Sequence, residues 1–176
     1  MFVLFVRLIP HRTVNDHKAM ISKVYDNLVP GGWAEFQDWT VEVIGENEAA
    51  EKIVQDSALK KWCELGVAGG AKFGRNFRAP LQYKQWMMEA GFVDIHEEQI
   101  LVPVNVWPLD PAERRLGGWF SLDVQKGVKG TAKLLEAAGM ASQDIPDFMD
   151  QVCRSVTHQD MRAYSPHLVF YGRKPE

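Results

Sequence analysis

Five side chains that could bind or activate a ligand lie within or just after two apolar runs near the start of the chain. The first run, residues 2–9, is nearly continuously apolar, which is typical of a strand covered on both faces inside a parallel sheet. The second run begins at Trp33. Ligands in open α/β sheets bind beyond the carboxyl ends of the strands, so residues near those ends are expected to face a pocket. They are Arg7 near the end of the first run, His11 just after it, and Gln37, Asp38 and Trp39 in the second.

These residues also have ordinary structural interpretations. Arg7 could equally be a solvated or capping side chain, His11 suits an ordinary loop, and Trp39 suits core packing. A second set of large residues could line an aromatic substrate chamber, although large side chains at helical spacing are usually core residues. That set is Phe73, Arg75, Tyr83, Trp107 and Trp119.

Other kinds of catalytic site find no support. Glu97 and Glu98 are adjacent on an expected strand and point to opposite faces, so they cannot act as an acid–base pair. The five histidines and two cysteines lack close metal-ligand spacing, and we expect no metal site. No serine lies in a nucleophile-elbow motif, so the usual hydrolase signature is absent from the sequence. No catalytic residue is therefore assigned.

Composition indicates a globular protein in a reducing compartment. The chain has 176 residues, of which 46% are hydrophobic and 24% charged, with a formal net charge of -3. That charge gives no reason to expect a nucleic acid or an anionic membrane as partner. Cys63 and Cys153 form no CxxC motif, and no apolar run approaches the roughly 18 residues of a membrane span. We expect a location in the cytosol or nucleus.

Capping and turn residues divide the chain into alternating strands and helices within one expected domain, 1–176. Thr13 with an acid three residues later fits a helix N-cap, and the Pro-Gly-Gly turn at 30–32 stops that helix. The glycine-rich stretch 66–74 predicts a flexible lid loop. Gly117 and Gly118 inside a helical pattern cost about 1 kcal/mol each relative to Ala, which indicates close backbone packing. Strands are expected at 2–9, 33–44, 92–105 and 167–173, and helices at 13–28, 49–66, 80–90, 110–120, 131–138 and 145–156.

Three segments, in this order, resemble the LaeA-like fungal methyltransferases, which are class I S-adenosylmethionine-dependent enzymes. They are 25–36 (YDNLVPGGWAEF), 86–94 (WMMEAGFVD) and 169–175 (VFYGRKP). The resemblance implies an α/β, Rossmann-like sheet whose full strand order is 3-2-1-4-5-7-6 with an antiparallel last strand. The four expected strands would be equivalent to 4-5-7-6, flanked by helices. Some members of this family are tied to the regulation of secondary metabolism.

The same resemblance implies S-adenosyl-L-methionine as cofactor and an unidentified methyl acceptor. It places Arg7 and His11 beside the cofactor, and the other candidate residues around the acceptor. The family's Gly-rich turn and ribose-binding acid belong to its first three strands, which have no counterpart here, and 66–74 lacks G-x-G-x-x-G spacing. We therefore expect an N-terminally truncated methyltransferase domain that binds the cofactor weakly or not at all.

Two alternatives stay open. The chain could be a non-catalytic interaction module derived from a methyltransferase, which self-associates through the exposed edge of its first strand. It could also be an incomplete gene product whose true start lies upstream.

Overall fold

The computed structural model describes residues 3–7 and 15–176, with only the backbone described for residues 3–7. The chain divides into two compact units, each built from separate stretches of sequence. The first unit comprises 1–40, 75–100 and 167–176, and the second comprises 41–74 and 101–166. The expectation of a single domain over 1–176 stays a prediction.

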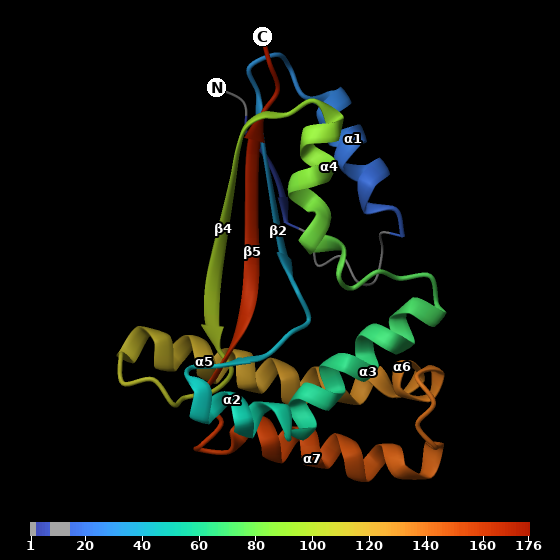
Figure 1. The fold of residues 1–176 in the computed structure, drawn as a ribbon, viewed down its shortest axis with the longest axis vertical. Coiled ribbons are helices and arrows are strands. Elements are labelled where there is room, and N and C mark those ends of the chain that lie inside the picture. Colours follow the sequence, from blue (N-terminus) through green and yellow to red (C-terminus); the bar gives the residue numbers. More distant parts are fainter. Residues whose placement is uncertain (1–2, 8–14) are drawn as a thin grey trace. The chain divides into compact units, whose positions relative to one another are not determined.

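The first unit is built on a mixed sheet (Figure 1). Strand β1 (Val3–Arg7) pairs in parallel with β2 (Trp33–Trp39), with Arg7 opposite Gln37. Strand β2 runs antiparallel to β5 (Ala163–Arg173), and β4 (Val93–Pro103) also pairs with β5. The resulting order, β1-β2-β5-β4, confirms the predicted 4-5-7-6 arrangement with an antiparallel last strand.

Two helices of this unit, α1 (His17–Asn27) and α4 (Tyr83–Ala90), lie side by side against the sheet (Figure 1). A short 3-10 helix, η2 (Ala79–Gln82), carries Pro80 near its start and leads into α4. Helix α4 ends at Gly91, whose φ of +101° favours glycine. The buried core of the unit consists of Ile21, Leu28, Ala34, Phe36, Ala79, Tyr83, Met87, Phe92, Leu168 and Phe170.

The predicted cap of α1 needs correction. Asp16 occupies the N-cap position, and its carboxylate accepts a hydrogen bond from the backbone N–H of Ala19 at 2.8 Å. An aspartate cap satisfies one free N–H of the first turn and also suits the positive end of the helix. Thr13, which the sequence suggested as the cap, lies outside the described residues.

The second unit is mainly helical. Its helices are α2 (Glu48–Gln55), α3 (Ala58–Lys72), α5 (Pro111–Gly127), α6 (Ala132–Ala137) and α7 (Ile145–Thr157), with the 3-10 helices η3 (Val128–Thr131) and η4 (Ser142–Asp144). A short strand, β3 (Ile44–Gly45), pairs with the first residues of β5. The predicted stripe on the last helix is buried at four positions. Its members are Ile145, Phe148, Val152 and Val156.

Three predicted boundaries are wrong for identifiable reasons. The strand expected to reach residue 44 stops at Trp39, and Val41 then adopts a φ of +50°, which is not an extended conformation. The helix expected at 49–66 is two helices, because Ser57 caps a new one by accepting from the N–H of Lys60 at 3.1 Å. The third boundary is that of the glycine-rich stretch 66–74, which was expected to be a loop.

The predicted lid loop at 66–74 is mostly helix. Gly66, Gly69 and Gly70 are buried residues of α3, which continues to Lys72. A Cβ on Gly69 would overlap the backbone of Leu134 in the packed region of α6. Gly69 therefore serves close helix packing, the role that the sequence had suggested only for Gly117 and Gly118. For Gly117 that prediction is confirmed, since a Cβ there would overlap the carbonyl oxygen of Asn105.

Candidate functional site

A buried carboxyl group stands at the carboxyl end of β2 in the first unit. Asp38 is fully buried, and its Oδ2 accepts a hydrogen bond from the Tyr83 hydroxyl at 2.8 Å. Its Oδ1 accepts from the backbone N–H of Trp39 at 2.7 Å. Tyr83 begins α4 and is itself fully buried. The structure thus joins two predicted site residues that lie far apart in the sequence.

The surroundings of this pair favour its neutral forms. Burial raises the pKa of Asp38 to about 7, while the hydrogen bonds from Tyr83 and the Trp39 N–H act in the opposite direction. Burial, and then the negative charge of Asp38, raise the pKa of Tyr83 above its ordinary value. Asp38 therefore ionises near neutral pH, whereas the Tyr83 hydroxyl stays protonated and remains a hydrogen-bond donor.

A histidine lies beside the tyrosine ring. His17, the first residue of α1, is 5% exposed, and its ring centroid lies 5.9 Å from that of Tyr83. Burial lowers the pKa of His17, against the effect of the Asp16 charge. Its buried Nε2 has no hydrogen-bond partner within the described part of the chain. A buried polar atom without a partner is costly, so this nitrogen is a place where a polar group could bind.

The opposite face of β2 carries the other predicted residues. Successive strand side chains alternate between faces, and Ala34, Phe36 and Asp38 form the buried row of β2. Gln37 and Trp39 occupy the half-buried row, where Gln37 donates to the carboxylate of Glu35. The prediction that Gln37, Asp38 and Trp39 jointly face one acceptor stays a prediction, and this alternation separates Asp38 from the other two.

Trp39 lies beside a second histidine, with the two ring planes tilted by 55°. The ring centroids of Trp39 and His167 are 4.6 Å apart, as the β2–β5 register places these residues opposite each other. Burial lowers the pKa of His167, and its buried Nδ1 also lacks a hydrogen-bond partner among the described atoms. Sequence analysis assigned no role to His17 or His167. Both lie in ordinary element positions, and only the cross-strand register would have placed His167 beside Trp39.

The remaining candidates are distributed over both units. Phe73 caps the end of α3 and is 54% exposed, and Trp119 on α5 is 70% exposed. Trp107 donates its indole N–H to the carbonyl of Ala163 at 3.1 Å within the second unit. Arg75 is in the first unit. The aromatic chamber made by these residues stays a prediction.

The proposed cofactor-side residues lie at the edge of what the structure describes. The backbone of Arg7 ends β1 directly opposite Gln37, at the carboxyl edge that β1 and β2 share, and its side chain is outside the described part. His11 lies outside the described residues. Among the residues that the structure does describe, no group of three His, Cys, Asp or Glu side chains could hold a metal ion. Nor is any of the described helices long and apolar enough to cross a membrane.

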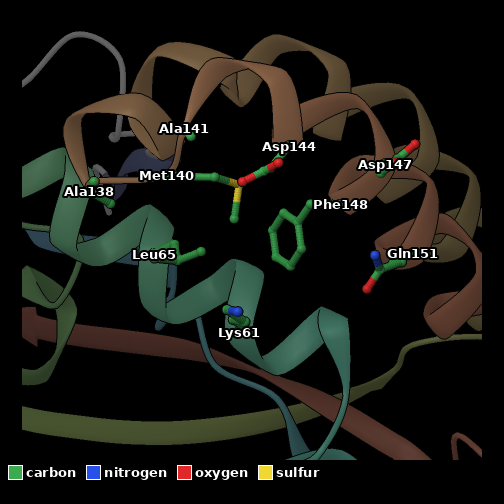
Figure 2. Close-up of a pocket in the computed structure, with 10 residues that line it drawn as sticks. Lys61, Leu65, Ala138, Met140, Ala141, Asp144, Asp147, Phe148 and Gln151 are labelled. Carbon is green, nitrogen blue, oxygen red and sulfur yellow. The ribbon is translucent and has the colours of Figure 1, made fainter.

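The second unit has a cavity of about 640 Å³ between α3, α7 and the segment that follows α6 (Figure 2). Leu65, Met140 and Phe148 form its apolar part, and Lys61 lies with its Nζ 5.8 Å from the centroid of the Phe148 ring. Asp144 and Asp147 stand on the α7 side. No sequence motif predicts this cavity, because its lining residues come from three separate segments of the chain. It could take a small amphipathic molecule.

The comparisons with known proteins point in one direction. No protein-family model matches the chain. The probable methyltransferase tdiE of Emericella nidulans is 28% identical over 173 residues, which are 97% of this chain and 54% of that protein. The secondary metabolism regulator laeA of Fusarium oxysporum f. sp. lycopersici is 28% identical over 158 residues, 86% of this chain and 48% of that protein.

The chain is homologous to fungal methyltransferases, and its matches include LaeA-type secondary metabolism regulators. It spans about half the length of the curated relatives that it matches. The chain also overlaps the structure of phosphoethanolamine N-methyltransferase 2 of Haemonchus contortus in complex with S-adenosyl-L-methionine. That overlap has a TM-score of 0.45 and 16% identity, over 99% of this chain and 33% of the other, and it carries no argument about function.

Proposed function

We propose that this chain carries the acceptor-side portion of an S-adenosylmethionine-dependent methyltransferase. The proposal is supported by methyltransferase relatives over nearly the whole chain, together with the β1-β2-β5-β4 strand order. The observation that carries the site is the buried Asp38–Tyr83 pair at the carboxyl edge of β2, with His17 beside it. Ligands of open α/β sheets bind at that edge.

The chemistry requires orientation more than proton transfer. The sulfonium of S-adenosylmethionine supplies an electrophilic methyl group, so the protein must hold donor and acceptor in line and exclude water. Asp38 is fully buried and touches no solvent, which makes it a positioning residue. It fixes the Tyr83 hydroxyl, and Tyr83 in turn packs against His17 at the start of α1.

We also propose that this chain by itself binds the cofactor weakly. The glycine-rich stretch that could have offered backbone N–H groups to a ligand is instead part of α3, with Gly69 packed against Leu134. Calorimetric titration with S-adenosylmethionine and with S-adenosylhomocysteine should give millimolar or weaker dissociation constants. A micromolar constant would show that other residues form a cofactor site.

Methyl transfer itself is tested separately. With tritiated S-adenosylmethionine at millimolar concentration and a fungal extract as acceptor source, we expect labelling whose rate rises linearly with cofactor concentration. Tyr83→Phe should reduce the rate, and heat-denatured protein provides the background. Labelling no higher than that background would overturn the methyltransferase proposal and leave the weak-binding proposal standing.

A second candidate function is a non-catalytic interaction module. It is favoured by the position of β1, which is terminal in the order of the described strands and leaves one edge available for pairing. A chain that sediments only as a monomer would speak against this candidate. For either function we propose the cytosol or nucleus as location, in keeping with the absence of a disulfide between Cys63 and Cys153.

A further inference from the structure

The helix α5 exposes an apolar face to solvent. One side of this helix is buried through Gly117, Ser121 and Val124. At 3.6 residues per turn, the opposite side is centred on Trp119. Trp119 is 70% exposed, and it is flanked by Leu116 at 44% and Leu122 at 39%. We call these three residues, with the exposed Arg115 and Asp123 beside them, the α5 face.

Such a face is unusual on an isolated protein. Single exposed apolar side chains are normal, but a contiguous group marks an interaction surface. Tryptophan and arginine are the residues most enriched at the energetic centres of protein interfaces. The tryptophan also stands at the middle of this group, where an interface would remove it from water most completely.

The order of residues on the α5 face is symmetric about Trp119. Three positions before it is Leu116 and three positions after it is Leu122. Four positions before it is Arg115 and four positions after it is Asp123. The apolar residues of the α5 face therefore have the same order read in either direction along the helix, and the two ends of the face carry opposite charges.

We propose that the α5 face binds the α5 face of a second copy of this chain, with the two helices antiparallel and a twofold axis at Trp119. In that arrangement each Leu116 meets Leu122 of the second copy, and each Arg115 meets Asp123 of the second copy. The two tryptophans pack against each other on the axis. A twofold contact uses the same patch on both molecules, so a self-complementary pattern is what it requires.

The charges of Arg115 and Asp123 favour a second copy as the partner and an antiparallel orientation of the two helices. A parallel helix pair would set Arg115 against Arg115 and Asp123 against Asp123, two repulsive contacts in place of two attractive ones. A different protein would have no need of a palindromic surface on this chain. Complementarity of charge under a twofold operation therefore points to a second copy. One helix pair buries less than the roughly 1,600 Å² of a standard interface, so the dimer should be weak, in the micromolar range.

Sedimentation equilibrium of the full chain over a micromolar concentration series tests this directly. The unchanged chain should form a reversible monomer–dimer mixture, and Trp119→Ala should weaken the dimer by at least about tenfold. Lys133→Asp, at an exposed position of α6 outside the α5 face, is the control and should leave the dimer unchanged. Circular dichroism confirms that each variant keeps its helices.

A charge exchange tests the antiparallel register. Arg115→Asp alone and Asp123→Arg alone should each weaken the dimer by about tenfold, since each creates two like-charge contacts. The double variant Arg115→Asp/Asp123→Arg should restore it to within about threefold of the original. Failure of the double variant to recover would refute the proposed register.

The other outcomes are equally decisive. A chain that stays monomeric throughout the series would refute the dimer. A dimer insensitive to Trp119→Ala would also refute the proposal, and would favour association through the β1 edge.

Discussion

Replacing Gly69 by alanine should destabilise the second unit, because α3 and α6 meet at this residue without room for a methyl group. A Cβ at Gly69 would overlap the carbonyl oxygen of Leu134 and lie 2.7 Å from the carbonyl carbon and 3.0 Å from the Cα. All three are backbone atoms, so no side-chain rotation can relieve the overlap and the helices must separate. Overpacking of this kind typically costs about 1–3 kcal/mol.

The same helix provides a matched control. Nothing lies within 4 Å of a Cβ built on Gly66, which is also inside α3. Alanine is favoured over glycine in a helix interior by about 1 kcal/mol, so Gly66→Ala should stabilise the unit by up to that amount. In Gly69→Ala that gain offsets part of the overlap, leaving a net loss of up to about 2 kcal/mol. Two identical substitutions one turn apart should thus have opposite signs.

Urea unfolding followed by far-ultraviolet circular dichroism measures both effects as changes in the free energy of unfolding. In thermal unfolding, each kcal/mol corresponds to a shift of roughly 2–4 °C for a chain of this size. A Gly69→Ala variant stabilised as much as Gly66→Ala would show that α6 leaves room for a methyl group at this position of α3. Equal destabilisation by both variants would show that residues 66–69 are not in a helix.

Three further predictions concern the buried pair and α5. Asp38→Asn should remove a pH dependence of stability between about pH 4 and pH 7, measured as the free energy of unfolding at several pH values. Tyr83→Phe should lower the free energy of unfolding by about 1–3 kcal/mol in urea, because the buried carboxyl of Asp38 loses its hydroxyl donor. Gly117→Ala should lower the thermal midpoint, since its Cβ would lie 2.7 Å from the carbonyl carbon of Asn105. Gly127→Ala, with nothing within 4 Å of its Cβ, should leave that midpoint unchanged or slightly raise it.

The sign of the pH effect follows from the raised pKa of Asp38. The pKa rises from 3.8 to about 7 on folding, so between these values the folded chain holds a proton that the unfolded chain has lost. The protonated Asp38 carboxyl contributes its full stabilisation below pH 3.8. This contribution to the free energy of unfolding decreases as the pH rises toward 7 and is absent above that. The slope is at most about 1.4 kcal/mol per pH unit. A wild-type stability that rose over this interval, with Asp38→Asn showing no rise, would contradict the assignment.

Local signals in the sequence predicted most of the first unit correctly. The Pro-Gly-Gly turn, the apolar run at 2–9 and the glycine that ends α4 each act within a few residues, so they are visible without the fold. The boundary at Trp39 was not visible, since no turn residue marks it and Val41 adopts a positive φ despite its branched side chain.

The glycine-rich stretch of α3 shows why the second unit was harder to predict. Glycine is read in a sequence chiefly as a residue that ends helices, and four glycines within 66–74 predicted a loop. In α3 the value of Gly69 is the absence of a side chain where α6 approaches, and that depends on a contact with a distant segment. The Asp38–Tyr83 hydrogen bond has the same origin: both residues could be proposed for a site, but their pairing required the packing of α4 against β2.

The interleaving of the two units has a consequence for synthesis on the ribosome. Strand β5, which lies between β2 and β4 in the first unit, is made after both of them and after the helices of the second unit. Until residue 173 has left the exit tunnel, β2 and β4 have no strand to pair with between them, while the helices of the second unit are already complete. The nascent chain therefore holds an open strand edge through most of its translation, a state in which chaperone binding or aggregation competes with folding.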